Sequence, residues 1–338
     1  MLGGQTTLAT VADESQVGEA RRMVTVACRR LGLDETVAGK AAVVVTEAAT
    51  NIVKHAGRGE ILVRAVPDGI EMMALDRGPG IGDIATSLRD GFSTSGTQGT
   101  GLGAIRRMAT TFDIYSAPGL GTAVLARIVS PAAATASRPA ANGSRLVTSA
   151  VSVPIAGETV NGDAWAEEHL HHGLRILLVD GLGHGPVANE AAHAAVEAFQ
   201  SAPGEAPTSA VETCHLAMRS TRGAALAVAE ISTQPAMVRF AGIGNVAGSI
   251  WSGTVSHHTV SLNGTAGHGT IRPREFSYPW PAGGLLVLAS DGLTTRWSLE
   301  SYPGLASHDP ALVAGILYRD HSRGRDDVTV VVAREARR

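Results

Sequence analysis

Three polar residues with the spacing of one helix face are the first candidates for chemistry. Glu47, Asn51 and His55 lie four residues apart, within a stretch whose apolar residues recur with helical period from Val37 to Ile52. Residues at i and i+4 share one helix face, so a single ligand could meet all three. A carboxylate one turn before an amide suits a general base next to a ligand of a metal ion. Because ordinary solvated helices also show this spacing, Glu47 and Asn51 need support from other motifs.

Two glycine-rich segments downstream supply that support. A hydrophobic strand ends in DRGPG, which starts at Asp76, and there an acceptor carboxylate adjoins glycines that let a ligand ring approach the backbone. The run GTGLG, which starts at Gly99, directly precedes a helix, whose first N–H groups and positive dipole end suit phosphates. One glycine loop is a weak indication, but ExxxN, DxGxG and GxGxG in this order predict one nucleotide pocket.

Acidic residues mark the ends of predicted strands in the second half of the chain. They are Asp163 in NGDAW, Asp180 before GLGHG, Asp291 after GLLVLAS, and Asp326 and Asp327 before VTVVVA. Hard oxygen ligands with little histidine favour Mg²⁺ or Mn²⁺, and a shared aspartate could hold two ions about 3.5 to 4 Å apart. One such aspartate alone is typical of a turn or a cap, so the predicted metal centre depends on their combination.

Two domains must position these residues. The stretch from Ser130 to Arg145 is rich in small residues and proline without apolar periodicity, which predicts a flexible tether. Before it, helical spacing over 17–31 and 37–52 is followed by two strands, a glycine-rich loop, a short helix and a hairpin. After it, strand-like runs alternate with two helical stretches. We therefore expect an α+β protein with domains 1–130 and 146–338, joined by residues 131–145.

Composition excludes several classes of protein. The chain has 338 residues, 44% hydrophobic and 17% charged, with a formal net charge of −3, so it is globular and unsuited to a nucleic-acid or anionic-membrane partner. Cys28 and Cys214 form no CxxC pair, which excludes a disulfide framework and a cysteine-ligated zinc site. Because the N-terminus has no secretory pattern and no apolar run reaches membrane-span length, we expect a cytoplasmic protein.

The first half resembles the Bergerat-fold (GHKL) ATPases, and within them the RsbT-type serine/threonine switch kinases. The sequences DRGPGI, DGFSTSGTQGTGLGAIRRM and DIYSAPGLGT carry the resemblance. It implies an α/β sandwich in which Glu47 is the general base, Asn51 binds Mg²⁺ and Asp76 accepts a hydrogen bond from adenine. Histidine kinases share this ATP site, but they need a phosphoacceptor histidine upstream, and the first histidine here is His55. The residues implied to bind ATP are Asn51, Asp76, Gly78, Gly80, Gly99, Thr100, Gly101, Leu102, Gly103 and Thr122.

The second half resembles the metal-dependent protein serine/threonine phosphatases of the PPM type, in their compact SpoIIE and RsbX branch. The ordered motifs GD, DGLGHG, SDG and RDDVT carry this resemblance. It implies an α-β-β-α sandwich with two Mn²⁺ or Mg²⁺ ions, bridged by Asp180, one of them bound by the Gly181 carbonyl. The arginine that grips substrate phosphate in eukaryotic relatives has no obvious counterpart in the sequence. The residues implied to complete the metal shells are Asp163, Asp291 and Asp326, with Asp327 ranked below Asp326.

Together the two resemblances imply a fusion of opposed activities. One domain would phosphorylate, and the other dephosphorylate, a serine or threonine of a STAS-domain protein, an anti-sigma antagonist or stressosome-like protein. That cycle would control a stress or sigma-factor output, with a downstream sigma-regulatory protein as a second partner. Two alternatives stay open. The first domain could sequester its partner with ATP as a conformational ligand, or nucleotide could merely regulate the phosphatase.

Overall fold

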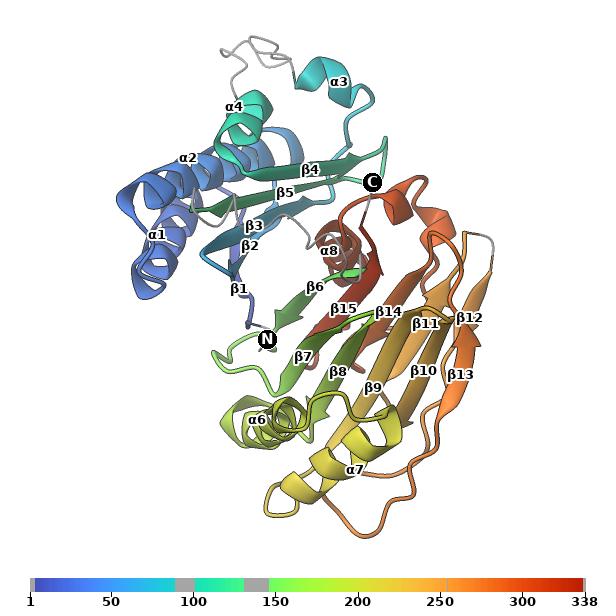
Figure 1. Cartoon of the computed structure of the whole chain (residues 1–338). Helices are drawn as coiled ribbons and strands as arrows, with labels where there is room; N and C mark the ends of the chain where they lie inside the picture. The colour runs from blue at the N-terminus through green and yellow to red at the C-terminus, as the bar shows by residue number, and fades with distance from the viewer. Residues whose placement is uncertain (1–3, 89–100, 131–145, 254, 337–338) are drawn as a thin grey trace. The chain divides into compact units, whose positions relative to one another are not determined.

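The computed structural model of the chain describes residues 4–88, 101–130, 146–253 and 255–336. Residues 131–145 of the predicted tether lie outside the described residues, as do Gly99 and Thr100 of the predicted phosphate loop. The chain divides into two compact units (Figure 1). The N-terminal unit comprises Thr6–Arg138 and Tyr302–Arg319, and the C-terminal unit comprises Met1–Gln5, Pro139–Ser301 and Asp320–Arg338.

The N-terminal unit is an antiparallel sheet with helices on one face (Figure 1). Its strands are β1 (Thr7–Val11), β2 (Gly59–Val66), β3 (Gly69–Asp76), β4 (Thr111–Ser116) and β5 (Thr122–Val129), and its covering helices are α1 (Glu14–Arg30), α2 (Glu35–Asn51) and α4 (Gly101–Met108). The strand order is β1-β2-β3-β5-β4, and each neighbouring pair is antiparallel. The helices bury their apolar faces against this sheet.

Local sequence explains where α1 and α2 start. The side chain of Asp13 accepts the N–H groups of Ser15 and Gln16, and that of Asp34 accepts the N–H of Val37, so each aspartate caps a helix. Helix α2 ends at Asn51 and continues as a π-helical turn, Ile52–Ala56. Such turns are rare in proteins, and those that occur often lie at functional sites. The predicted helix is therefore present, and its last α-helical residue is the candidate Mg²⁺ ligand.

The other face of the same sheet contacts a segment from far along the sequence. Met72 and Ala74 of β3 belong to the core under the helices, so the alternating Met73 and Leu75 point the opposite way. Both lie against Gly315 of helix α8 (Pro310–His321). Sequence pattern places this segment in the second domain, but its contacts place Tyr302–Arg319 in the N-terminal unit. We call Tyr302–Arg319 the docked segment.

The C-terminal unit stacks two antiparallel sheets, with strand orders β13-β10-β9-β8-β7 and β12-β11-β14-β15-β6. Apolar residues of both sheets form its core, and α6 (Gly185–Ser201) and α7 (Pro207–Ala217) cover the first sheet (Figure 1). This arrangement confirms the α+β class. The strands are β6 (Leu146–Val153), β7 (Asp163–Leu170), β8 (Gly173–Gly181), β9 (Ala224–Thr233), β10 (Ala236–Ile243), β11 (Ala247–Trp251), β12 (Ser256–His258), β13 (Phe276–Pro279), β14 (Leu285–Ala289) and β15 (Val328–Glu335).

A buried carboxylate links three parts of the N-terminal unit. Glu71 of β3 is 1% exposed and pairs with Arg64 of β2 at 2.8 Å and with Arg127 of β5 at 2.6 Å. Burial alone would raise the pKa of Glu71, but attraction to the two guanidinium groups outweighs it and leaves the pKa below its ordinary value. Arg127 in turn holds Asp309 of the docked segment at 2.6 and 2.7 Å. The pairing therefore ties three strands and the docked segment together.

Replacing Glu71 by Gln should weaken this sheet, because two guanidinium groups lose their shared buried partner. Breaking a buried pair costs about 3 to 5 kcal/mol, so amides of β3 and β5 should exchange hydrogen faster in the full chain, as measured by mass spectrometry. Since the folded-state pKa is lowered, the wild-type advantage should be complete at neutral pH and disappear as pH falls through that pKa. The exposed control Glu19→Gln should change nothing. Unchanged exchange in Glu71→Gln would contradict the role of this pairing.

Candidate functional site

Asp76 lies at the end of β3, where backbone donors fix its carboxylate. Its Oδ1 accepts the N–H of Gly78 at 2.8 Å and the N–H of Thr122 at 3.2 Å. Strand register places Asp76 directly opposite Thr122. Burial raises the pKa of Asp76, although the two N–H donors and nearby cations oppose the rise. A half-buried carboxylate oriented in this way can accept a hydrogen bond from an amino group.

The loop after Asp76 is held against the β4–β5 hairpin. The Oγ of Ser116 accepts the N–H of Ile81 at 2.8 Å and lies 2.9 Å from the Oγ1 of Thr122. Gly80 has a φ of 75°, and a Cβ there would collide with the carbonyl of Ala117. Packing therefore requires glycine at this position. These contacts hold the loop close to Asp76 and Thr122, the two residues predicted to contact adenine.

Asn51 lies next to the start of the glycine-rich helix α4. Its Oδ1 lies 2.9 Å from the position that a Cβ on Gly101 would take, so a side chain there would displace the amide. Leu102 and Gly103 continue helix α4, and Glu47 is half-buried one turn before Asn51 on α2. The first residue of α4 and the candidate Mg²⁺ ligand are thus neighbours, which suits a bound triphosphate.

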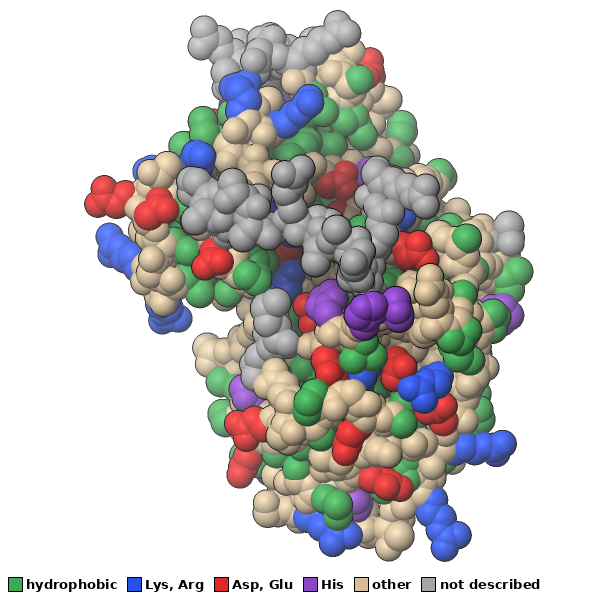
Figure 2. Space-filling model, in the orientation of Figure 1, with side chains coloured by type: hydrophobic (Ala, Val, Ile, Leu, Met, Phe, Trp, Pro, Cys, Tyr) green, Lys and Arg blue, Asp and Glu red, His purple; other side chains and the backbone are tan. Residues whose placement is uncertain are grey.

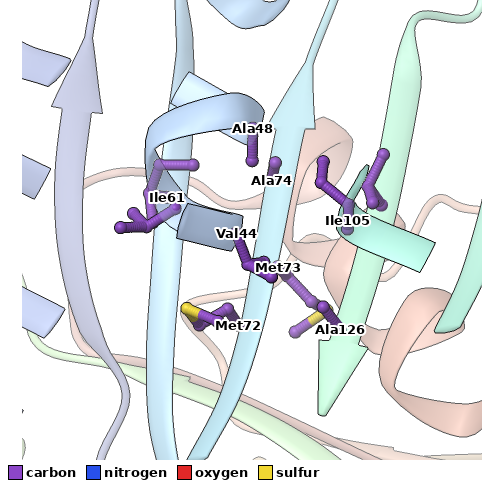
Figure 3. Close-up of a pocket in the computed structure, with 10 residues that line it drawn as sticks. Val44, Ala48, Ile61, Met72, Met73, Ala74, Ile105 and Ala126 are labelled. Atoms are coloured by element: carbon purple, nitrogen blue, oxygen red, sulfur yellow. The ribbon is translucent and has the colours of Figure 1, made fainter. Parts of the chain in front are cut away.

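The cavity between α2, α4 and the sheet is separate from this cluster (Figure 3). Its volume is about 10 Å³, and its labelled walls include Val44, Ala48, Met72 and Ile105. That volume is room for one water molecule at most, and an apolar lining offers it no partners. We interpret the cavity as a packing gap in the core.

Carboxylates gather at one end of the strands in the C-terminal unit. Asp163 at the start of β7 pairs in register with Asp180 near the end of β8. The backbone N–H of Asp291, just after β14, donates to the Oδ2 of Asp180 at 3.3 Å. Three of the predicted metal ligands therefore come together from strands that are far apart in the sequence.

The electrostatics of these carboxylates favour a divalent cation. Burial, followed by the charge of Asp291, raises the pKa of Asp180 to about 7. Burial and the charge of Asp180 raise the pKa of Asp163 well above its ordinary value, and burial and the charge of Asp326 raise that of Asp291. A bound divalent cation would relieve the repulsion between such desolvated carboxylates. Within the described ranges no three acidic, histidine or cysteine side chains form a ready-made ligand group, so an ion would have to draw them inward.

Hydrogen bonds distinguish ligand candidates from supporting residues. The Oδ2 of Asp163 accepts the hydroxyl of Ser290 at 2.6 Å, so a neighbouring side chain already binds this oxygen. Asp327 uses both oxygens on backbone N–H groups, of Ile155 at 2.7 Å and of Gly162 at 2.6 Å. Asp327 therefore holds the loop that precedes Asp163 in place. Asn245, which sequence reasoning missed, donates to the Oδ2 of Asp291 at 2.6 Å.

The loop after Asp180 adjoins an exposed arginine that the sequence did not reveal. A Cβ on Gly181 would collide with the carbonyl of Ala188, so this loop packs tightly on helix α6. The Nη1 of Arg222 lies 3.4 Å from the position that a Cβ on Gly183 would take. His184 occupies the N-cap position of α6 without a capping hydrogen bond from its side chain, and its Nδ1 lies 3.1 Å from the Oε1 of Glu158. Arg222 stands well after this loop in the sequence, and no motif joins the two.

The surface carries mixed charges. Figure 2 shows acidic and basic side chains interspersed on the face in view, without one continuous basic area. Among the described helices, none is long and apolar enough to cross a membrane.

Comparisons with known proteins match both units. The family description of the histidine kinase-like ATPase domain matches residues 10–128, and that of stage II sporulation protein E (SpoIIE) matches residues 171–335. A crystal structure described as the PP2C phosphatase domain and a fragment of the regulatory domain of SpoIIE from Bacillus subtilis matches with a TM-score of 0.50 and 18% identity. The match covers 95% of this chain and 98% of that chain. At this identity the likeness concerns the fold alone.

Two curated relatives, both from Bacillus subtilis (strain 168), extend these matches. The serine/threonine-protein kinase RsbT is 34% identical over 120 residues, which are 34% of this chain and 90% of RsbT. The phosphoserine phosphatase RsbX is 24% identical over 153 residues, which are 45% of this chain and 73% of RsbX. The predicted fusion of a kinase-like unit with a PP2C-type unit is confirmed. The chain belongs to the RsbT family through its histidine kinase-like ATPase domain, and it joins this domain to a SpoIIE-type PPM phosphatase domain.

Proposed function

We propose that the chain is a bifunctional partner-switching regulator that adds phosphate to, and removes it from, one serine or threonine of a STAS-domain protein. The observation that carries the proposal is the cluster of desolvated carboxylates around Asp180 in a chain whose other unit is RsbT-like. The names of the relatives, a serine/threonine kinase and a phosphoserine phosphatase, support opposed activities on one kind of residue. ATP is the phosphate donor in this proposal, with Mg²⁺ as its cofactor.

In the kinase reaction, residues of α2 and the start of α4 bind and orient the reactants. Glu47 accepts the proton of the substrate hydroxyl, and Asp76 and Thr122 hold adenine. Asn51 would hold Mg²⁺, which when bound would neutralise part of the negative charge of the triphosphate. Gly101, Leu102 and Gly103 present backbone N–H groups toward the phosphates, and the neighbouring Gly99 and Thr100 complete the same run in the sequence.

In the phosphatase reaction, strand-end carboxylates hold the metal centre and the surrounding residues keep them in place. Asp180 would be shared between two ions, Mn²⁺ or Mg²⁺, with Asp291, Asp326 and the Gly181 carbonyl as further ligands and Asp163 outside them. When bound, the ions supply Lewis acidity that activates water and neutralises the phosphate. Ser290 and Asn245 orient Asp163 and Asp291 through the hydrogen bonds described above.

Glu47→Gln should abolish phosphate transfer and spare nucleotide binding, since the amide cannot accept a proton. We expect transfer from radiolabelled ATP to a purified STAS-domain protein to fall at least about 100-fold, with ATP affinity changed less than about threefold. Glu35→Gln, exposed in the first turn of the same helix, is the matched control. Wild-type rates of phosphate transfer in Glu47→Gln would exclude Glu47 as the general base. A protein that binds its partner with ATP but never labels it would favour the sequestering alternative.

Asp180→Asn should lose most of the phosphatase activity, because it removes charge from both ion positions at once. With p-nitrophenyl phosphate we expect a loss of at least about 100-fold and a higher Mn²⁺ requirement, both larger than in Asp163→Asn. Given ATP and partner, Asp180→Asn should also accumulate more phosphorylated partner than the wild type. Asp68→Asn in an exposed turn is the control. Wild-type activity that persists in excess EDTA would refute the metal centre.

Arg222→Ala should weaken phosphate recognition, because this guanidinium lies beside the loop that follows Asp180. We expect KM for a phosphoserine peptide to rise about tenfold, with kcat and the Mn²⁺ requirement little changed. Arg222→Lys should show a smaller rise in KM than Arg222→Ala, and the control Arg272→Ala, at an exposed position, should keep the wild-type KM. An unchanged KM in Arg222→Ala would mean that the metal ions alone bind the phosphate.

A further inference from the structure

The docked segment is fixed on the N-terminal unit by charged and polar contacts. Asp309 binds the guanidinium of Arg127 through both carboxylate oxygens, at 2.6 and 2.7 Å. The backbone N–H of Asp309 donates to the Oδ2 of Asp113 at 2.8 Å, and the Nδ1 of His308 lies 2.9 Å from the Oδ1 of the same residue. These contacts hold the start of α8 against β4 and β5.

The far end of the docked segment reaches the candidate adenine site. The Nη1 of Arg319 donates to the backbone carbonyl of Asp76 at 2.6 Å, and its Nη2 donates to the carbonyl of Leu120 at 2.9 Å. Arg319 is 7% exposed. Gly121 has a φ of 72°, and a Cβ there would lie 2.1 Å from the carbonyl oxygen of Asp76 and 2.9 Å from the Nη1 of Arg319. A side chain at this turn would therefore conflict with the end of β3 and with the guanidinium that binds it.

The two carbonyls belong to the backbone that carries the candidate adenine contacts. Asp76 ends β3, and Leu120 lies two residues before Thr122, which faces Asp76 across the strand pair. A guanidinium is planar and rigid, so two of its N–H groups can fix the distance between these backbones. Its charge also favours the ionised carboxylate of Asp76, the form that accepts a hydrogen bond.

We propose that Arg319, supplied by the docked segment, is a positioning residue of the nucleotide site that holds Asp76 and Thr122 in register for adenine. The proposal rests on the proposed nucleotide site and adds that this site is complete only with a residue from beyond the ATPase-like sequence. Arg319 donates to the two backbone carbonyls on the adenine side of the site, those of Asp76 and Leu120. Its loss should therefore affect recognition of the base and not of the phosphates.

The test compares two ligands in the full chain by calorimetry with Mg²⁺. Arg319→Gln should bind ATP about tenfold more weakly than the wild type, whereas affinity for inorganic tripolyphosphate, which has no base, should stay the same. Arg319→Lys keeps the charge but loses the rigid fork, so it should lose only about threefold in ATP affinity. Arg30→Gln, exposed at the end of α1, is the control.

A pH series gives a readout that a merely structural role would not change. An ionised Asp76 accepts the adenine hydrogen bond more strongly than the protonated acid does, so ATP binding weakens as pH falls through the pKa of Asp76. Since Arg319 lowers that pKa against the effect of burial, Arg319→Gln should move the acid limb of binding to higher pH, and Arg319→Lys should not. His55 is the other cation that acts on Asp76, and it is present in every variant, so its contribution cancels.

Three results would overturn the proposal. Equal ATP affinity and an equal pH profile in Arg319→Gln and the wild type would remove the positioning role while leaving the nucleotide site intact. Equal losses for ATP and tripolyphosphate would show a general collapse of the unit, which hydrogen exchange over β3 and β5 would register independently. Absence of ATP binding in the wild type would remove the nucleotide site itself, and with it the inference.

Discussion

A helix without a polar stripe must pack against other elements, and α8 imposes this constraint on the sheet of the N-terminal unit. All ten residues from Pro310 to Arg319 are buried, and the sequence PALVAGILYR offers no polar stripe to face water. The sheet of the N-terminal unit meets this demand, because β3 presents Met73 and Leu75 on the face that its own helices leave uncovered. The sheet is thereby packed on both faces.

Charge placement then decides how the docked segment is held. Arg127 shares its guanidinium between the buried Glu71 and the partly exposed Asp309, so the docked segment and the sheet interior are joined by one side chain. A pair of this kind contributes more to register than to net stability, since desolvation opposes the Coulomb gain. Arg319 likewise joins two segments, because its guanidinium donates to the backbone carbonyls of Asp76 and Leu120 and fixes the distance between them.

The two candidate sites use buried carboxylates in opposite ways. Asp76 is a single carboxylate that two backbone N–H donors orient, whereas burial and the charges of neighbouring carboxylates raise the pKa values of Asp163, Asp180 and Asp291. In both sites glycine is required by steric conflict with a nearby carbonyl, at Gly80 and at Gly181. The chain returns from the docked segment to the C-terminal unit at Asp320, shortly before the candidate ligand Asp326.

The sequence alone determined both folds and predicted the candidate site residues, because the signals are local: helical periods, glycine runs before a helix, and aspartates at strand ends. The register of the strand pairs places Asp76 opposite Thr122 and Asp163 opposite Asp180. Tertiary structure decided what no local pattern encodes. Helix α8 has no amphipathic period to detect, and Arg222 and Arg319 reach the candidate sites from distant parts of the sequence. Both oxygens of Asp327 accept backbone N–H groups of distant residues, whereas Asp326 accepts the N–H of its neighbour Asp327. These roles depend on contacts between distant segments, which only the folded chain specifies.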